Sequence, residues 1–458
     1  MPARLSRTLA AIATTVALAV TAPVASAAEQ APADQHFTGT LADGATWIAD
    51  VPGNWNGTLL LFSHGFGPTV AQDAPSAAAR TALLAEGYAL SGSSYDPNGS
   101  MWALNSAERD QFATLDAFAG TVGRPSRTIA VGQSMGGLVN AQIARDGAGR
   151  VDGALGLCGL VAGGTDLDNY QLDAEHTLAR LLLPGEQVKL TGFATQEEAA
   201  AIADRLTAAV TAAQTTPQGR ARIALAAAYL NLADWAPGQD RPAPTDFEGQ
   251  EQQQYAWLAQ GLLSFIEGGR YAVEQSAGGN NSWNKGVSYA ALLAGSAHAP
   301  QVHALYRAAG LSLRTDLAAL TASADVVADP AAVRTAQRTS SAGQGLSVPL
   351  LDVHTTADNL VPVEQESAFA ARVEASDDAG LLRQAYVERQ GHCAFTTAET
   401  LAAVHAIDRR ITAGHWGNVA EPGTLQRSAL ALNLDGAAYL PYRPDALTVG
   451  RTATRHSH

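Results

Sequence analysis

Short apolar runs alternate with stretches of helical periodicity along the first part of the chain. Four apolar runs predict buried strands, at residues 58–63, 88–92, 127–132 and 151–158. Three stretches between them predict helices, at residues 76–86, 106–122 and 135–145. Residues 36–41 and 46–51 predict a hairpin that turns at Ala42-Asp43-Gly44. Strands separated by helices indicate crossover connections and a mainly parallel sheet.

The alternation stops in the middle of the chain. From about residue 163 to 344 no run predicts a strand, and Ala, Leu, Gln and Glu recur at helical spacing. Strand-like runs return at 348–354 and 382–388, and a helical stretch follows at 398–411. Since the later strands are needed to complete the sheet that the earlier ones begin, we favour one interrupted sheet over two independent domains.

The predicted organisation is therefore an α/β core with a large helical insertion. The core comprises residues 36–162 and 346–414, with helices on both faces of a mainly parallel sheet, and the insertion comprises residues 163–345. Residues 415–458 show little periodicity and predict an irregular C-terminal tail.

The N-terminus has the pattern of a secretory signal peptide over residues 1–28. Arg4 and Arg7 precede a short apolar stretch from Leu9 to Val20, and Ala25-Ser26-Ala27 fits the small-residue pattern before a cleavage site. The stretch is short for a membrane span, although a retained anchor is the alternative. No later segment predicts a transmembrane helix, so we expect a secreted, extracellular protein without stable membrane insertion.

Composition and charge narrow the possible partners. Of the 458 residues, 47% are hydrophobic and 16% charged, which is typical of a globular protein. A net charge of −14 argues against nucleic acid as a main partner. The eleven histidines show no close metal-ligand spacing, and two cysteines are too few for a zinc cluster. We therefore expect neither a metal nor a cofactor.

One motif indicates a nucleophile. Gly132-Gln133-Ser134-Met135-Gly136 matches G-x-S-x-G, follows an apolar strand and opens a helical stretch. A serine on such a tight turn exposes its hydroxyl above the sheet, and the helix N-terminus directs N–H groups toward developing negative charge. The alternative is an ordinary glycine-rich turn, in a chain with 43 glycines.

A nucleophilic serine needs a base, and the base needs a carboxylate. His392 follows the last predicted strand of the core, and Asp358 follows the strand at 348–354. Asp352 competes with Asp358 but lies within the apolar run of that strand. The resulting chain order, Ser134, Asp358 and His392, is the order found in α/β-hydrolases.

An oxyanion hole requires two backbone donors. One should be the N–H of Met135, directly after the serine. The second should come from Ser63-His64-Gly65-Phe66-Gly67, which follows the strand at 58–63. Phe66 is our choice for this donor and Gly65 is the alternative, while His64 is expected to order the loop.

These motifs together resemble those of secreted bacterial α/β-hydrolases of the esterase and lipase kind. The resemblance covers about residues 36–160 and 348–412 and rests on His64-Gly65, the serine motif, Asp358 with Val361-Pro362, and Gly391-His392. It implies an α/β-hydrolase fold, ester hydrolysis through an acyl-enzyme without a cofactor, and a helical cap where the insertion lies.

A further likeness concerns the cysteines. His392-Cys393 is similar to the arrangement in feruloyl esterases and tannases, in which a cysteine beside the histidine is joined to one beside the serine. Here Gln133 precedes Ser134, so that pairing is not available. The resemblance suggests a related Cys158–Cys393 disulfide, and two buried free thiols are the alternative.

The predicted function is hydrolysis of a small-molecule or polymeric carboxylic ester by a Ser-His-Asp mechanism. Trp235, Tyr255, Trp257, Trp283 and Tyr289 in the insertion are candidates for binding an apolar or aromatic group, or for ordinary core packing. The alternatives are a capped aminopeptidase or amidase, for which an acidic pair such as Glu197-Glu198 or Glu248 with Glu251 could bind an amine, and a non-catalytic binding protein.

Overall fold

Strand β3 (Thr58–Ser63) is an interior strand of the sheet, and all six of its residues are buried. It belongs to a nine-stranded sheet of order β1-β2-β4-β3-β5-β6-β7-β8-β9 in a computed structural model that describes residue 1 and residues 33–449. The other strands are β1 (Gln35–Thr40), β2 (Thr46–Val51), β4 (Ala89–Ser93), β5 (Arg127–Gln133), β6 (Gly153–Leu157), β7 (Leu350–Ala357), β8 (Leu382–Gln390) and β9 (Tyr439–Leu440). The predicted signal peptide lies outside the described residues.

Strands β4, β3, β5, β6, β7 and β8 are parallel, whereas β1, β2 and β9 pair antiparallel at the two sides of the sheet. The parallel strands therefore end at one edge, where the loops after β3, β5, β6, β7 and β8 meet. Ligands bind beyond this edge in sheets of this kind. The strand order and the helical crossovers are those of the α/β-hydrolase fold.

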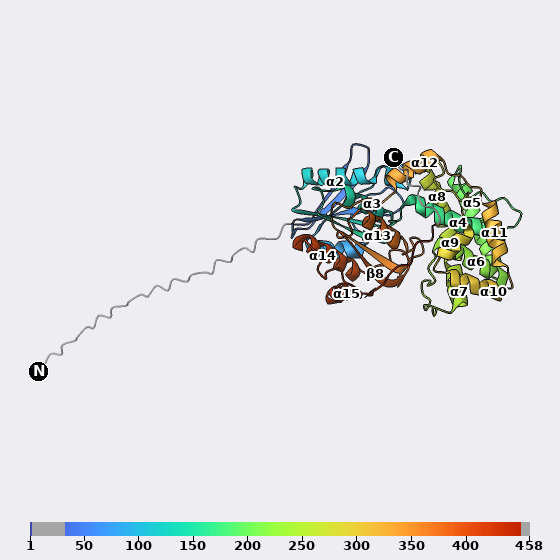
Figure 1. Cartoon of the computed structure of the whole chain (residues 1–458). Helices are drawn as coiled ribbons and strands as arrows, with labels where there is room; N and C mark the ends of the chain where they lie inside the picture. Colours follow the sequence, from blue (N-terminus) through green and yellow to red (C-terminus); the bar gives the residue numbers. More distant parts are fainter. Residues whose placement is uncertain (2–32, 450–458) are drawn as a thin grey trace.

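Helices cover both faces of the sheet (Figure 1). On one face lie α2 (Ala107–Thr121), α3 (Met135–Asp146) and α13 (Gln365–Ala375), whose apolar side chains pack on residues such as Ala130 and Leu350. On the other lie α1 (Ala77–Ala85), α14 (Thr397–Ala413) and α15 (Pro422–Ala431), which pack on residues such as Val131 and Leu351. Neighbouring residues of a strand face opposite sides, so near-continuous apolar strands supply both layers.

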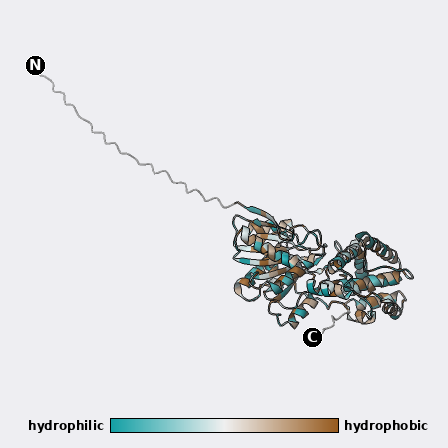
Figure 2. Cartoon of the chain, turned by 90° about the horizontal axis from the view of Figure 1, so that it is seen from above, coloured by the Kyte–Doolittle hydropathy of each residue, from teal (hydrophilic) through white to brown (hydrophobic). Residues whose placement is uncertain are grey.

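The segment between β6 and β7 is entirely helical or irregular, and the structure describes all of its residues. Its helices are α4 (Gly164–Leu182), α5 (Gln196–Ala213), α6 (Pro217–Leu230), α7 (Phe247–Trp257), α8 (Leu263–Ala277), α9 (Tyr289–Gly295), α10 (Ala299–Ala308), α11 (Leu313–Ser323) and α12 (Pro330–Thr339). Two perpendicular views show this helical insertion as a lobe beside the α/β core, with hydrophobic and hydrophilic residues mingled along its helices (Figures 1 and 2). One cluster of buried side chains runs from α3 into α4 and α6, so the two lobes share a core.

The tail differs from our expectation. Residues 415–449 are not irregular throughout, because they include α15 and β9, which lie against the core. Leu425 and Ala429 of α15 are buried with residues of α14, and Tyr439 pairs with Val387 on β8. Both elements are too short to produce a clear periodicity, and packing on the core stabilises them.

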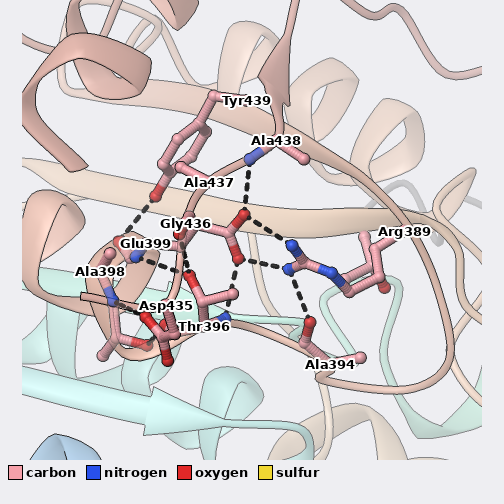
Figure 3. A network of polar contacts seen from close by, with 12 residues as sticks. Arg389, Ala394, Thr396, Ala398, Glu399, Asp435, Gly436, Ala437, Ala438 and Tyr439 are labelled. Carbon is pink, nitrogen blue, oxygen red and sulfur yellow. Dashed lines mark hydrogen bonds and ion pairs between the residues drawn. The ribbon is translucent and has the colours of Figure 1, made fainter. Parts of the chain in front are cut away.

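Polar contacts fix the tail to the start of α14 (Figure 3). The buried Glu399 carboxylate accepts hydrogen bonds from the backbone N–H of Thr396 and Ala438, each at 2.8 Å, and pairs with Arg389. Arg389 also donates to the carbonyl of Ala394 at 2.9 Å. The loop between β8 and α14 is therefore held from both sides.

Candidate active site

Ser134 stands at the sharp turn between β5 and α3, with φ and ψ angles of 59° and −122°. Left-handed φ values are rare for residues other than glycine and occur at strained functional turns. The flanking glycines allow this turn. A Cβ atom on Gly136 would lie 1.9 Å from the carbonyl oxygen of Ser63, and one on Gly132 would lie 2.0 Å from that of Gly136. The motif thus lets a strand, a turn and a helix approach within backbone contact.

The three residues predicted as a triad meet at the carboxyl edge of the sheet. The Nε2 atom of His392 lies 2.8 Å from Oγ of Ser134, and its Nδ1 atom lies 2.7 Å from Oδ2 of Asp358. Ser134 follows β5, Asp358 follows β7 and His392 follows β8. These distances allow a proton to pass from the serine hydroxyl to the imidazole while the carboxylate holds the ring.

Asp358 is buried, and both oxygens of its carboxylate face hydrogen-bond donors. Its Oδ1 atom accepts hydrogen bonds from the backbone N–H of Leu360 and Val361, both at 2.9 Å, while Oδ2 faces His392. Burial alone would raise the pKa of Asp358, but the charges and hydrogen bonds of His392 and His354 lower it well below its usual range. The carboxylate therefore remains ionised.

Asp352, the competing carboxylate in the sequence, does not lie at the position of the triad acid beside His392. It lies within β7, is buried, and its oxygens have no hydrogen-bond partner among the described residues. Burial, followed by the charge of Glu366, raises the pKa of Asp352 well above its ordinary value, which favours the neutral acid. His392 bonds to Asp358 instead.

A second histidine, which the sequence analysis did not single out, lies behind Asp358. His354 is buried, with Nδ1 3.0 Å from Glu366 Oε1 and Nε2 2.9 Å from the carbonyl oxygen of Val361. Both ring nitrogens thus face acceptors. Burial would lower the pKa of His354, but hydrogen bonds to Asp358 and Glu366 raise it well above its usual value. We infer a buried imidazolium.

The loop after β3 lies against the serine. A Cβ atom on Gly65 would be 3.2 Å from Cβ and 3.6 Å from Oγ of Ser134, so only a glycine fits easily. Met135 is the first residue of α3, and its N–H has no acceptor within the helix. Phe66 lines the pocket beside Ser134. The residues expected to supply the two backbone donors, Phe66 and Met135, therefore both lie close to Ser134.

His64 is buried behind that loop. Its Nδ1 atom lies 2.8 Å from the carbonyl oxygen of Gly65, and its ring stacks on Tyr95 with the centroids 4.1 Å apart. Burial lowers the pKa of His64, which favours the neutral ring. These contacts fit the expected role in ordering the loop.

Cys158 and Cys393 form a disulfide, the pairing that the family likeness suggested. Cys158 follows β6, between the strands that lead to Ser134 and Asp358, and Cys393 follows His392. The Sγ atom of Cys393 lies 3.3 Å from Nε2 of His392. The bridge therefore fixes the histidine loop to the middle of the sheet edge.

The same two cysteines and His392 are the one cluster of potential metal ligands found among the described residues. Bonded cysteines, however, offer no thiolate to a metal.

A pocket between the core and the helical insertion opens onto Ser134 and His392. It is narrow, and its lining is mostly apolar. The core contributes Phe66, Trp102, Leu160, Leu360 and Val361, and the insertion contributes Leu167, Asp168, Gln171, Phe265, Ile266, Gly269 and Val273. Phe66 contacts both Phe265 and Trp102, with centroids 5.7 Å and 6.4 Å apart. The apolar side chains around Ser134 therefore come from both lobes.

The insertion residues named from the sequence are not those at the pocket. None of the five aromatic candidates lines it, and Trp257 and Tyr289 are buried in the core of the insertion. The acidic pairs at 197–198 and at 248 and 251 do not line it either; Asp168 of α4 does. Helical periodicity places such residues on a buried face without telling which lobe they meet.

Within residue 1 and residues 33–449 there is no helix of the length and hydrophobicity needed to cross a membrane.

The chain resembles several known hydrolases. It is 30% identical to o-phthalyl amidase of Xanthobacter agilis over 447 residues, which covers 88% of this chain and 94% of that protein. No family model matches the chain. Among solved structures, an esterase from Aspergillus oryzae has 13% identity and a TM-score of 0.40, covering 81% of this chain and 78% of that one. An esterase from Pyrococcus furiosus has 10% identity and a TM-score of 0.37, with 84% and 92% covered. The length and identity of the first match, on an α/β-hydrolase fold, show that this chain is a hydrolase that belongs to the family of o-phthalyl amidase.

Proposed function

We propose that this protein is a secreted serine hydrolase that cleaves amides and esters of aromatic carboxylic acids through an acyl-enzyme. The observation that carries the proposal is the continuous path from Ser134 Oγ to His392 and Asp358, at 2.8 Å and 2.7 Å. The Cys158–Cys393 disulfide supports an oxidising, extracellular location, in keeping with the predicted signal peptide.

In the first half of the reaction, His392 removes the proton of Ser134 as the serine attacks the substrate carbonyl. The backbone N–H groups of Phe66 and Met135 stabilise the negative charge on the carbonyl oxygen. His392, now an imidazolium stabilised by Asp358, gives its proton to the leaving amine or alcohol. Water then repeats these steps on the acyl-enzyme and releases the acid.

The natural scissile bond is proposed to be an amide, with esters as further substrates. Ester hydrolysis was the first expectation, and an amidase the alternative. The long match to an amidase favours the amide as the natural bond. Esters remain substrates under this proposal, because the same acyl-enzyme forms more easily when an alcohol leaves.

The acyl group is proposed to be aromatic. Phe66, Trp102 and Phe265 line the pocket beside Ser134, and flat apolar walls of this kind match a phenyl ring. The relative is named for the o-phthalyl group, which is also an aromatic acyl group.

The test compares Ser134→Ala with Ser126→Ala. Ser126 is an exposed serine at the opposite end of the same strand, where its hydroxyl donates to the carbonyl of Gly57. Fluorophosphonate labelling and hydrolysis of benzoyl 4-nitroanilide and 4-nitrophenyl benzoate should be lost in the first variant and kept in the second. Labelling or turnover that survives Ser134→Ala would refute the mechanism, and failure of the unaltered protein to react would support a non-catalytic binding protein.

A further inference from the structure

The catalytic pocket contains two polar side chains that the triad does not use. Asp168 and Gln171 lie three residues apart on α4, which places them on the same side of the helix. Both line the pocket, whose remaining walls outside the reacting residues are apolar or glycine. In ligand pockets, a few polar groups among apolar ones fix the orientation and the identity of the ligand.

The protein only partly satisfies the carboxylate of Asp168. Its side chain is buried, with a residue exposure of 1%, and neither carboxylate oxygen makes a hydrogen bond of normal geometry to a described residue. Its polar neighbours are the charge of Arg270 and the side chain of Asn281, which both act to lower its pKa against the effect of burial. No hydrogen bond from the Gln171 amide to another described side chain or backbone group is found either. A buried carboxyl group without a partner destabilises the fold, so one that faces a pocket is best explained by a ligand that completes its contacts.

The nearest buried cation is engaged elsewhere. Arg270 donates from Nη1 to the backbone carbonyl of Asp168 at 3.3 Å, not to its carboxylate, and from Nη2 to Glu175 at 2.7 Å. Its Nε atom lies 3.7 Å from Glu267. Acidic groups therefore outnumber this single arginine around Asp168, and the pocket presents acceptors to a ligand and no Lys or Arg side chain.

We propose that Asp168 and Gln171 form a subsite for a hydrogen-bond donor, a hydroxyl or amino group, on the acyl part of the substrate. This assignment rests on the proposed function. An acyl group with a donor at this place would complete the contacts of Asp168, whereas an acyl group with a carboxylate there would meet a like charge. The preferred substrates are thus amides and esters of hydroxy- or amino-substituted aromatic acids, in preference to carboxy-substituted ones such as o-phthalyl compounds.

The test uses 4-nitrophenyl benzoates that carry a hydroxyl, amino or carboxyl group at the ortho, meta or para position, with unsubstituted benzoate as the reference. The assay is run at pH 8, where the Asp168 carboxyl group is ionised. For the unaltered enzyme, kcat/KM for the best donor-substituted ester should then exceed that for benzoate by about tenfold or more, because the donor bonds to a charged group. The carboxyl analogue at the same position should be slower than benzoate.

Asp168→Asn and Gln171→Leu should each reduce the ratio of donor-substituted to unsubstituted kcat/KM, with the larger reduction, about tenfold, for Asp168→Asn. Asp116→Asn, which removes a carboxylate from an exposed ion pair with Arg150, is the matched control and should leave the ratio unchanged. An unchanged ratio in Asp168→Asn, or a preference of the unaltered enzyme for the carboxyl analogue, would overturn the subsite.

A second measurement separates this inference from the proposed function. Binding of benzamide and of its hydroxy, amino and carboxy derivatives to the Ser134→Ala variant is followed by calorimetry, which needs no turnover. Donor-selective binding without hydrolysis by the unaltered protein would contradict only the proposed function. Hydrolysis without donor selectivity in either assay would contradict only the subsite.

Discussion

The Nε2 atom of His354 lies 3.6 Å from Oδ2 of Asp358, the same oxygen that lies 2.7 Å from Nδ1 of His392. Asp358 therefore lies between two imidazole rings, one partly open to the pocket and one buried. The buried ring is held by the carboxylate of Glu366, which in turn accepts a hydrogen bond from Gln384. The imidazolium inferred at His354 therefore places a positive charge behind the carboxylate of the triad.

Replacing one member of the His354–Glu366 pair should lower the free energy of unfolding more than replacing both. His354→Gln leaves the buried Glu366 carboxylate without its cation, so the free energy of unfolding should fall by about 3–5 kcal/mol. The double variant with Glu366→Gln removes both charges and should be more stable than the single one. In both variants kcat should decrease, because Asp358 loses the neighbouring charge. Urea unfolding and steady-state kinetics measure these effects, and a single variant as stable as the double one would contradict the ion pair.

The same pair predicts how stability depends on pH. The pKa of His354 is raised in the folded state, so protonation stabilises the fold fully below the unfolded value of about 6.5. This contribution is lost as the pH rises from there through the folded pKa. Urea unfolding between pH 6 and 10 should show an alkaline loss of stability that is smaller in the double variant. Parallel curves for the two proteins would argue against a buried imidazolium.

Asp168 should show a different pH dependence. Burial, opposed in part by the charge of Arg270, raises the pKa of Asp168 to about 7, so the neutral acid is favoured in the folded state. The stability associated with that form is lost as the pH rises from about 4 to about 7. Asp168→Asn cannot ionise, so at pH 8 it should exceed the unaltered protein in stability by about 1–3 kcal/mol. A destabilised Asn variant at pH 8 would indicate a structural role for Asp168.

Opening the Cys158–Cys393 disulfide should affect both stability and catalysis. The bridge spans 235 residues of sequence, and its removal by Cys158→Ala with Cys393→Ala should lower the free energy of unfolding by about 2–5 kcal/mol. Because Cys393 adjoins His392, kcat should fall more than KM changes. Dithiothreitol should have the same effect on the unaltered protein and none on the double variant. Full activity after verified reduction would show that the bridge does not position the histidine.

Alanine substitutions at two helical glycines should change the stability of the protein in opposite directions. Gly136→Ala would place a Cβ atom 1.9 Å from the backbone of Ser63, so about 3 kcal/mol or more of stability should be lost. Gly120, within α2, has nothing within 4 Å of a built Cβ atom, so Gly120→Ala should gain about 0.5–1 kcal/mol. Thermal unfolding compares them. A tolerated Gly136→Ala would mean that the turn at Ser134 is not closely packed.

The sequence by itself determined most of the local structure and the identity of the residues that meet at Ser134. Apolar runs and helical periodicity predicted the core strands from residue 36 to 158 and the helices between them, because these patterns depend on neighbours a few residues away. The serine motif and the positions of Asp358 and His392 after their strands followed from parallel topology, which brings the ends of such strands to one edge.

The tertiary structure alone decided what surrounds those residues. His354 and Glu366 become partners only when α13 packs on the sheet, and Asp168 reaches the pocket only because the helical insertion packs against the core. The structure of the C-terminal tail also depends on tertiary packing, because β9 forms by pairing with β8. A helical pattern shows which face of a helix is buried but not against which distant segment, and long-range packing makes that choice.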